Sequence, residues 1–344
     1  MNRPDFLFRQ FDFYELMNSP HPIYILDSSN EENSQKIKEG IKKFKKLNIT
    51  YQWAPPGNDH VYSLMPLIKE KYCTTACDDD IMIPSIASEC ADFLENHPDY
   101  ATCMGKEVSI RFRPEDFNKP YGIIERATLP MGKSFEDEDA FQRARNFWSD
   151  PNHICLSVRR VEVERKIRNI TKNFFLTEAC TEFTVQSMPI VAGKAKILDR
   201  LGYIMQISGI RYGFVDVDEI DGFIASPSLK KKREIMFNGL SEIFQEQGKS
   251  KEKSVIMATV MFNIYTARCI NAEIKDLTSY LEQTGEVKSS PTKKAVSKRL
   301  KYFILGLPLF KRAYFKYKKP QDVMQPESPY FKEFKVIRDF LKSP

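Results

Sequence analysis

The chain has 344 residues, of which 42% are hydrophobic and 28% charged, with a formal net charge of +6. This composition excludes a chain that is disordered throughout, and the length suits one large domain or two ordinary ones. No apolar run reaches the ~18 residues that a membrane span needs, and the polar residues after Met1 predict no signal peptide. We therefore expect a cytoplasmic protein whose cysteines are structural thiols.

The first part of the chain alternates between helical and strand patterns. Leu7, Phe11 and Tyr14 recur at helical spacing, and Pro4 suits the first turn of that helix. Pro84 suits the start of another helix. The other expected elements are strands at 23–26, 49–53, 71–77 and 99–106, with helices at 33–47 and 60–71. Such alternation is typical of a parallel sheet with helices on its faces.

The later segments differ in character. Residues 107–150 are mixed and polar, and residues 153–172 combine apolar alternation with many charges, so neither stretch is assigned to an element. Helical spacing returns at 177–191, Gly193 suits the end of that helix, and 195–207 is expected to be extended. Long amphipathic segments after about residue 227 predict helices at 228–247, 252–284 and 293–319. We therefore expect an α/β domain over residues 1–225 and a helical region over residues 226–344.

Three consecutive carboxylates, Asp78–Asp80, follow the predicted strand at 71–77. They lie at the carboxyl end of a strand, which is where ligands bind in open α/β sheets. Adjacent carboxylates repel one another, and oxygen ligands suit a hard ion such as Mg²⁺ or Mn²⁺ that is shared with substrate phosphates. The alternative interpretation is a solvated acidic turn that caps the following helix.

Other acidic groups leave a similar choice open. Asp27 follows the strand at 23–26 and is either a ligand-binding residue or a turn residue. Asp216 and Asp218 are interpreted as part of a loop, with an acceptor-site group as the alternative. The run Glu136–Asp139 is expected in a solvated loop or at the start of a helix. The histidines lack metal-site spacing, and no catalytic Ser-His-Asp or Cys-His arrangement is readable from the sequence.

Four short motifs occur in an order that resembles the inverting GT-A glycosyltransferases. They are Asn2-Arg3-Pro4, Asp27-Ser28-Ser29, Asp78-Asp79-Asp80, and Thr181-Glu182 about eleven residues before Gly193. In that family the third motif is the metal-binding DXD motif, and the fourth is an acidic pair at the start of a helix. The resemblance covers roughly residues 1–210. It implies a GT-A fold, which is α/β with a mixed, mainly parallel sheet and helices on both faces.

The resemblance implies a role for each matching side chain. Asp80 and Asp78 would bind Mn²⁺ or Mg²⁺, which stabilises a leaving diphosphate. Glu182 would accept the proton of the acceptor hydroxyl, with Glu178, one helical turn earlier, as the reserve. The nucleotide-sugar donor would contact Arg3, Asp27, Asp78 and Asp79.

These roles predict a metal-dependent glycosyltransferase of surface polysaccharide biosynthesis. It would transfer a sugar, with inversion, from a nucleotide-diphosphate sugar to a glycan or lipid-linked acceptor. The family's first strand should precede Asn2, whereas this sequence begins at Met1. Either the start is placed too late or the strand is missing, so a degenerate, non-catalytic GT-A protein that docks a membrane or partner is the alternative. A nucleotidyltransferase would use similar carboxylates, but the sequence shows no Gly-rich phosphate loop near its N-terminus.

Residues 291–320 are rich in Lys and Arg, contain no acidic residue and interleave aromatic with apolar residues. A basic amphipathic segment of this kind suits an anionic membrane surface, so peripheral association at the inner face of a membrane is expected. A helix that packs its apolar face on the main domain is the alternative. No nucleic-acid partner is expected, because the overall charge is modest and no known module is recognisable.

Overall fold

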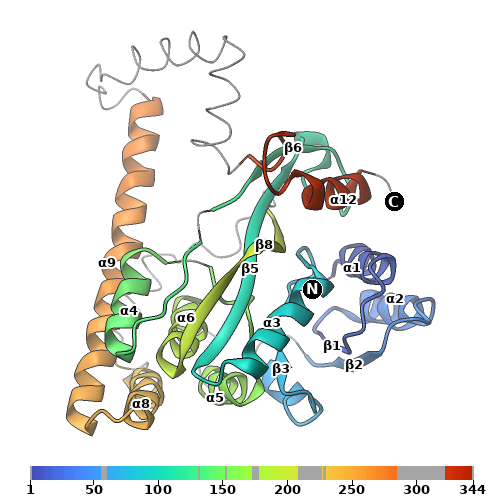
Figure 1. Ribbon diagram of the computed structural model, residues 1–344. Helices are drawn as coiled ribbons and strands as arrows, with labels where there is room; N and C mark the ends of the chain where they lie inside the picture. Colours follow the sequence, from blue (N-terminus) through green and yellow to red (C-terminus); the bar gives the residue numbers. More distant parts are fainter. Residues whose placement is uncertain are drawn as a thin grey trace.

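The computed structural model describes residues 2–55, 60–130, 132–151, 153–172, 178–207, 227, 230–284 and 322–342. One long strand, β5 (Tyr100–Phe112), runs through the middle of the molecule (Figure 1). It lies beside an equally long strand, β8 (Lys194–Gln206), over most of its length. These two strands form the centre of the larger sheet, and the remaining elements are arranged around them.

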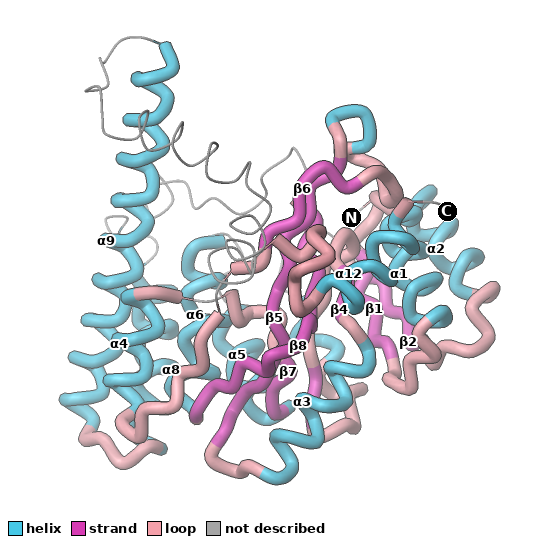
Figure 2. Tube along the Cα trace, turned by 45° about the horizontal axis from the view of Figure 1, so that its top comes forward, coloured by secondary structure: helices cyan, strands magenta, loops and turns pink. Residues whose placement is uncertain are grey.

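The larger sheet has the strand order β3–β7–β5–β8–β4, with β6 also paired to β5. Its shorter strands are β3 (Tyr72–Cys73), β4 (Ile81–Met82), β6 (Ile124–Thr128) and β7 (Val158–Arg160). A separate sheet consists of β1 (Ile23–Asp27) and β2 (Ile49–Trp53), which are parallel. Figure 2 shows this pair beside the larger sheet, close to α1 and α2.

The expected fold class, α/β with a mixed sheet, is confirmed, and the longest pairing, between β5 and β8, is parallel. In the larger sheet β5 and β8 are parallel, whereas the other four described pairings are antiparallel. Antiparallel neighbours need no crossover helix, so short strands such as β6 and β7 join the sheet through loops. Both strands lie in the stretches 107–150 and 153–172, to which the sequence assigns no element.

Two hydrophobic cores flank the central strands. One contains side chains of α1 (Pro4–Leu16), α3 (Pro84–Asn96) and α12 (Phe331–Leu341). The other lies among α4 (Ala140–Ser149), α5 (Val161–Thr171), α6 (Glu178–Ala192), α8 (Lys230–Glu246) and α9 (Lys251–Thr284). The division at residue 225 stays a prediction, and α8 and α9 share a core with helices that precede it.

Most of the predicted helices and strands are present. The expected helix at 60–71 is instead a short 3-10 helix, η1 (His60–Leu64). Pro66 explains this difference, because proline disfavours helical conformation in the residue before it and cannot continue the hydrogen-bond ladder. The helix expected at 33–47 is α2 (Glu31–Ile41), which ends before the lysine-rich stretch that follows. The helix predicted at 293–319 lies outside the described residues, as does the basic segment 291–320.

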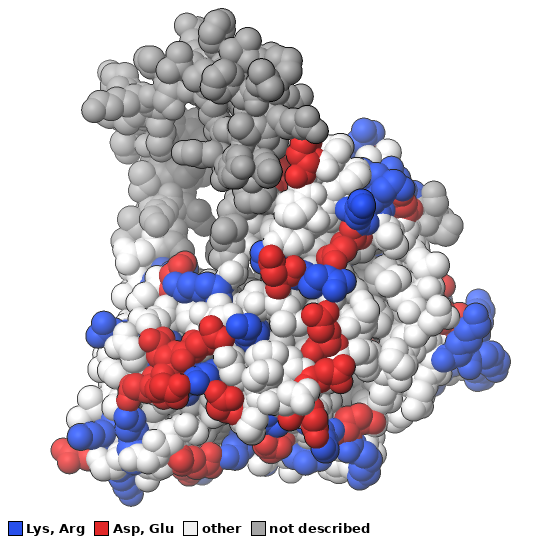
Figure 3. Space-filling view, viewed as in Figure 1, with Lys and Arg blue, Asp and Glu red and all other residues white. Residues whose placement is uncertain are grey.

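Charged side chains of both signs are interspersed over the face shown in Figure 3. The acidic run Glu136–Asp139 forms ion pairs with lysines of β8. Lys194 Nζ lies 2.6 Å from a carboxylate oxygen of Glu138, and Lys196 Nζ lies 3.0 Å from one of Glu136. Asp139 also caps α4, since it accepts the main-chain N–H of Gln142 at 2.9 Å. Both predicted readings of this run, solvated loop and helix start, therefore apply. Among the described helices, none has the length and apolar character needed to cross a bilayer.

The close approach of β5 and β8 predicts that replacing either glycine of one facing pair destabilises the protein. A Cβ atom on Gly105 would lie 2.7 Å from the Cα of Gly202. Because the contact is with main-chain atoms, it is not relieved by a side-chain rotation. We expect Gly105→Ala or Gly202→Ala to lower the free energy of unfolding by about 1–3 kcal/mol. Urea denaturation measures this change, and an unaltered midpoint would contradict the close approach.

Candidate functional site

A cavity of about 1660 Å³ opens between β1 and β3, next to the N-terminal end of α1. The structure brings to this one cavity most of the side chains selected from the sequence: Arg3, Asp27, Asp78, Asp79, Asp80 and Glu182. They come from segments far apart in the chain, at the ends of strands and helices. The prediction that these groups form one site is consistent with this placement.

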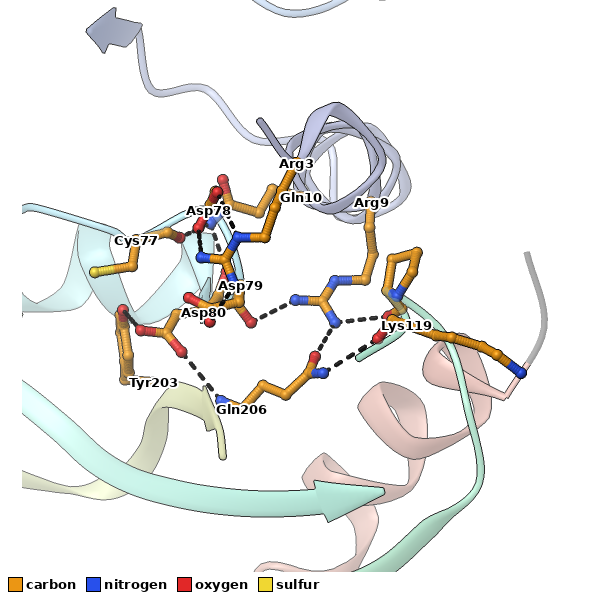
Figure 4. A network of polar contacts seen from close by, with 11 residues as sticks. Arg3, Arg9, Gln10, Cys77, Asp78, Asp79, Asp80, Lys119, Tyr203 and Gln206 are labelled. Atoms are coloured by element: carbon orange, nitrogen blue, oxygen red, sulfur yellow. Dashed lines mark hydrogen bonds and ion pairs between the residues drawn. The ribbon is translucent and has the colours of Figure 1, made fainter. Parts of the chain in front are cut away.

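Arg3 neutralises the first two carboxylates of the acidic run (Figure 4). Its guanidinium donates to both oxygens of Asp78, with Nε 3.1 Å from Oδ2, and to Asp79 Oδ2 at 3.0 Å. Burial lowers the pKa of Arg3, but the two carboxylates outweigh burial and raise it. The fork geometry of arginine suits such a two-carboxylate contact. The repulsion within the run is thus offset by a cation from the protein itself.

Asp80 points into the protein, away from its two neighbours. Only 5% of the residue is exposed. The Tyr203 hydroxyl donates to its Oδ2 at 2.7 Å, and the main-chain N–H of Gln206 donates to its Oδ1 at 3.0 Å. Burial and the nearby Asp79 raise the pKa of Asp80 to about 7, against the effect of these two hydrogen bonds. Asp80 therefore joins the acidic turn to β8.

Two buried side chains of α1 hold the acidic turn in place from the other side. Arg9, which is 1% exposed, donates to the main-chain carbonyls of Asp79 and Pro120 and to the Gln206 side chain. Burial lowers the pKa of Arg9 to about 10. Gln10 donates to the carbonyls of Cys77 and Asp80. Arg9, Gln10, Tyr203 and Gln206 were not selected from the sequence, and nothing in their local pattern marks them.

Asp27 is the last residue of β1, and its side chain holds the loop that follows. Its Oδ2 accepts the Tyr51 hydroxyl at 2.7 Å, and its Oδ1 accepts the main-chain N–H of Ser29 at 2.9 Å. Burial and the Asp27 carboxylate raise the pKa of Tyr51. Ser29 in turn accepts the main-chain N–H of Asn2 at 2.8 Å. These contacts place the loop after β1 next to the start of α1, and Asp27 serves both as a turn residue and as a residue of the cavity.

Glu182 lines the same cavity from the first part of α6. The Gln186 amide, one helical turn later, donates to its Oε1 at 2.8 Å. The helical position of the reserve residue Glu178 is confirmed, but its side chain lies outside the described part of the chain. Asp216 and Asp218 also lie outside it.

The arrangement of the acidic run does not fit the metal site that the sequence predicts. Asp80 is buried, and each of its oxygens already accepts a hydrogen bond. Arg3 occupies oxygens of Asp78 and Asp79 that a cation would need. Within the described residues, no group of three or more His, Cys, Asp or Glu side chains has a geometry suited to a metal ion. As arranged here, a guanidinium takes the place expected for Mn²⁺ or Mg²⁺.

A thiol, an imidazole and a carboxylate also meet beside the cavity. His153 Nδ1 lies 2.9 Å from Glu107 Oε2, and His153 Nε2 lies 2.9 Å from Cys155 Sγ. Burial lowers the pKa of His153, but Cys155 and Glu107 outweigh it and raise the pKa well above its ordinary value. A thiol held beside a base that a carboxylate orients has the geometry of an activated nucleophile. Sequence reasoning missed this group because Glu107 lies 46 residues before His153.

The burial of Asp80 predicts a specific dependence of stability on pH. Its folded-state pKa of about 7 lies above the ordinary aspartate value of 3.8, so the folded state retains a proton that the unfolded state releases. Stability therefore falls as pH rises from about 4 to about 7. We expect Asp80→Asn to gain stability relative to the original protein over this range, by up to about 4 kcal/mol.

Chemical denaturation at several pH values measures this difference. Asp92→Asn, a change of an exposed aspartate on α3, is the control and should keep the pH dependence of the original protein. Parallel pH curves for Asp80→Asn and the original protein would show that Asp80 ionises normally.

No family model matches the chain, and neither does any curated protein. Solved structures of S. aureus TarS do. TarS 1-349 is 11% identical with a TM-score of 0.39, over 77% of this chain and 87% of that one. Its complex with UDP-GlcNAc is 12% identical with a TM-score of 0.38, over 74% and 84%. The longer TarS chain is 11% identical with a TM-score of 0.39, and the match covers 71% of this chain and 42% of TarS. A likeness of this size assigns no activity.

Proposed function

We propose that the protein is a glycosyltransferase that transfers a sugar, with inversion, from a nucleotide-diphosphate sugar to a hydroxyl group. The observation that carries this proposal is the meeting of Arg3, Asp27 and Glu182 in one cavity at the carboxyl ends of β1 and β3. Binding at the carboxyl ends of strands is the rule for ligands of open α/β sheets. The cavity is also larger than the ~300–1,000 Å³ of typical small-molecule sites, so donor and acceptor both have room.

Each group has a distinct role in this proposal. Asp27, at the end of β1, accepts a hydrogen bond from the nucleoside. Arg3 is the cation nearest the diphosphate, where it stabilises the charge of the leaving group. Glu182 accepts the proton of the attacking hydroxyl, which typically contributes about 10²–10⁴-fold in rate. The hydroxyl then attacks the sugar from the face opposite the diphosphate, which inverts the configuration.

In this proposal a divalent cation would bind only where it displaces the Arg3 guanidinium from Asp78 and Asp79. Mn²⁺ or Mg²⁺ prefers the carboxylate oxygens that Arg3 contacts on Asp78 and Asp79. A cation and the guanidinium therefore compete for these oxygens. No step of the proposed reaction depends on the metal.

The acceptor proposed is a glycan or lipid-linked sugar in surface polysaccharide biosynthesis, at the inner face of a membrane. The basic segment 291–320 supplies the contact with anionic lipid in this proposal. Flotation with anionic vesicles at low salt measures this binding to lipid. If the protein does not float with the vesicles, the proposed membrane association is wrong.

A second candidate function is binding of the nucleotide sugar without transfer. It is favoured by one observation: Arg3 already neutralises Asp78 and Asp79, and Asp80 is internal. Such a protein would bind a donor and neither hydrolyse nor transfer it. Donor binding is therefore common to both candidates, and turnover separates them.

Glu182→Gln tests the transferase directly. We expect unchanged donor binding and a loss of about 10²–10⁴-fold in donor turnover, because the amide cannot accept the proton. Calorimetry with a panel of nucleotide sugars that includes UDP-GlcNAc measures binding, and release of the nucleoside diphosphate measures turnover. Glu162→Gln, on the exposed side of α5, is the matched control. Equal turnover in both variants would remove Glu182 as the base, and no binding of any donor would end the proposal.

Arg3→Gln tests the competition between guanidinium and cation. Removing one positive charge beside two carboxylates should tighten Mn²⁺ binding by roughly tenfold or more. Titration followed by the electron paramagnetic resonance of free Mn²⁺ measures the affinity. Arg113→Gln removes an exposed arginine outside the cavity and should leave the affinity unchanged. Equal Mn²⁺ affinities for the two variants would show that Asp78 and Asp79 do not bind the ion.

A further inference from the structure

A cysteine, a histidine and a glutamate form a row at the wall of the cavity, and the proposed function uses none of them. His153 and Cys155 both line the cavity. His153 Nε2 lies 2.9 Å from Cys155 Sγ, and His153 Nδ1 lies 2.9 Å from Glu107 Oε2. The imidazole therefore lies between the thiol and the carboxylate, with one ring nitrogen toward each.

Glu107 is firmly held at the carboxylate end of this row. It belongs to β5, at the centre of the larger sheet, where it lies opposite Tyr203 of β8. Its side chain is only 8% exposed, and its other oxygen, Oε1, accepts the Ser109 hydroxyl at 3.3 Å. A carboxylate oxygen accepts hydrogen bonds and does not donate them, so His153 Nδ1 carries the hydrogen of its contact with Glu107.

The loop that carries Cys155 is fixed from two neighbouring segments. The Arg159 guanidinium donates to the Cys155 carbonyl, and the Thr74 hydroxyl donates to the next carbonyl, that of Leu156, at 2.7 Å. The Cys155 side chain is partly buried and packs against both hydrophobic cores. The sulfur is thus held beside the imidazole, where its partial burial favours small reagents over large ones.

The charge of His153 decides the state of this sulfur. Burial lowers the pKa of His153, but Cys155 and Glu107 outweigh burial and raise it well above its ordinary value. An imidazolium has a hydrogen on each ring nitrogen, so it donates both to Glu107 and to Cys155. A sulfur that accepts such a bond is a thiolate, which is the reactive form of cysteine.

We propose that Cys155 is a site of oxidation by peroxides, with His153 as the proton donor and Glu107 as the residue that positions His153. The thiolate attacks one peroxide oxygen, so that an S–O bond forms as the O–O bond breaks. The departing oxygen takes the proton from His153 Nε2 and leaves as water or as an alcohol. The cysteine is thereby oxidised to a sulfenic acid and the peroxide is reduced.

Two features favour a peroxide among the reagents that a thiolate attacks. Formation of a sulfenic acid adds a single oxygen to the sulfur, which suits the partial burial of Cys155. The oxygen that leaves needs a proton, and the ring nitrogen 2.9 Å from the sulfur supplies one. The proposal rests on these side chains and does not depend on the proposed enzymatic activity.

The test compares two cysteines of the same cavity in the full chain. Cys77 also lines the cavity (Figure 4), but its enclosure there and the carboxylates of Asp80 and Asp79 raise its pKa and so disfavour its thiolate. The protein is treated with hydrogen peroxide at neutral pH, without any nucleotide sugar. The thiol that remains at each cysteine is then alkylated after unfolding and measured by mass spectrometry.

We expect Cys155 to lose its thiol at least about tenfold faster than Cys77, because an ordinary thiol is only a few per cent ionised at neutral pH. Equal rates at the two cysteines would overturn the proposal. Dimedone, which reacts with sulfenic acids, identifies the product when it is present during the oxidation. Absence of dimedone from Cys155 would show that the proposed sulfenic acid does not form.

His153→Gln removes the proton donor and the positive charge beside the sulfur. We expect the oxidation of Cys155 to slow by about tenfold or more, whereas the rate at Cys77 in the same sample stays the same. His97→Gln, which changes an exposed histidine outside the cavity, is the matched control and should leave both rates unchanged. An undiminished rate at Cys155 in His153→Gln would contradict the role of the imidazole.

Glu107→Gln tests the positioning role by the nuclear magnetic resonance of the His153 ring. In the original protein we expect the ring to titrate above its ordinary pKa of 6.5, because Cys155 and Glu107 favour the imidazolium. In Glu107→Gln the titration should move to lower pH, and the oxidation of Cys155 should slow with it. The ring of His97 is the internal control. An unmoved His153 titration would remove Glu107 from the proposal, and neither measurement depends on whether the protein is a glycosyltransferase.

Discussion

The rest of the site depends on how the protein accommodates three adjacent carboxylates. The charge of Asp78 and Asp79 is offset by Arg3 from the start of α1, and Asp80 turns inward to Tyr203 and Gln206 on β8. These contacts join α1, the acidic turn and β8. Arg9 and Gln10 add hydrogen bonds from the buried side of α1 to main-chain carbonyls of the same turn. The contacts that offset the repulsion within the run also hold the polar end of the cavity together.

In this arrangement the acidic run accepts hydrogen bonds from the protein, whereas the sequence predicts that it binds a metal ion. A metal site would keep its carboxylate oxygens open, whereas here they are occupied by donors from the protein. In the proposed function, the cationic charge for the diphosphate comes from Arg3, at the start of a helix that buried contacts of Arg9 and Gln10 hold in place. In the proposed function, transfer differs from binding alone by the proton acceptor Glu182, which lines the same cavity.

The cavity also links the two sheets, although they do not pair with each other. β1 is covered by apolar side chains on both faces, as is usual for an inner strand of a parallel sheet, yet it pairs on one side alone in the described structure. The polar groups that are proposed to bind the donor line this cavity at the carboxyl end of β1.

The sequence alone determined the elements that have strong local signals. Pro4 and Pro84 begin α1 and α3, and the predicted strand at 49–53 and helix at 252–284 agree closely with β2 and α9. Periodicity and proline chemistry act over a few neighbouring residues, so they can be read without a fold. Only the tertiary structure decided the partners: Arg3 lies 75 residues from Asp78, and Asp80 lies 123 residues from Tyr203. Burial and strand pairing arise from contacts between distant segments, and no local pattern encodes them.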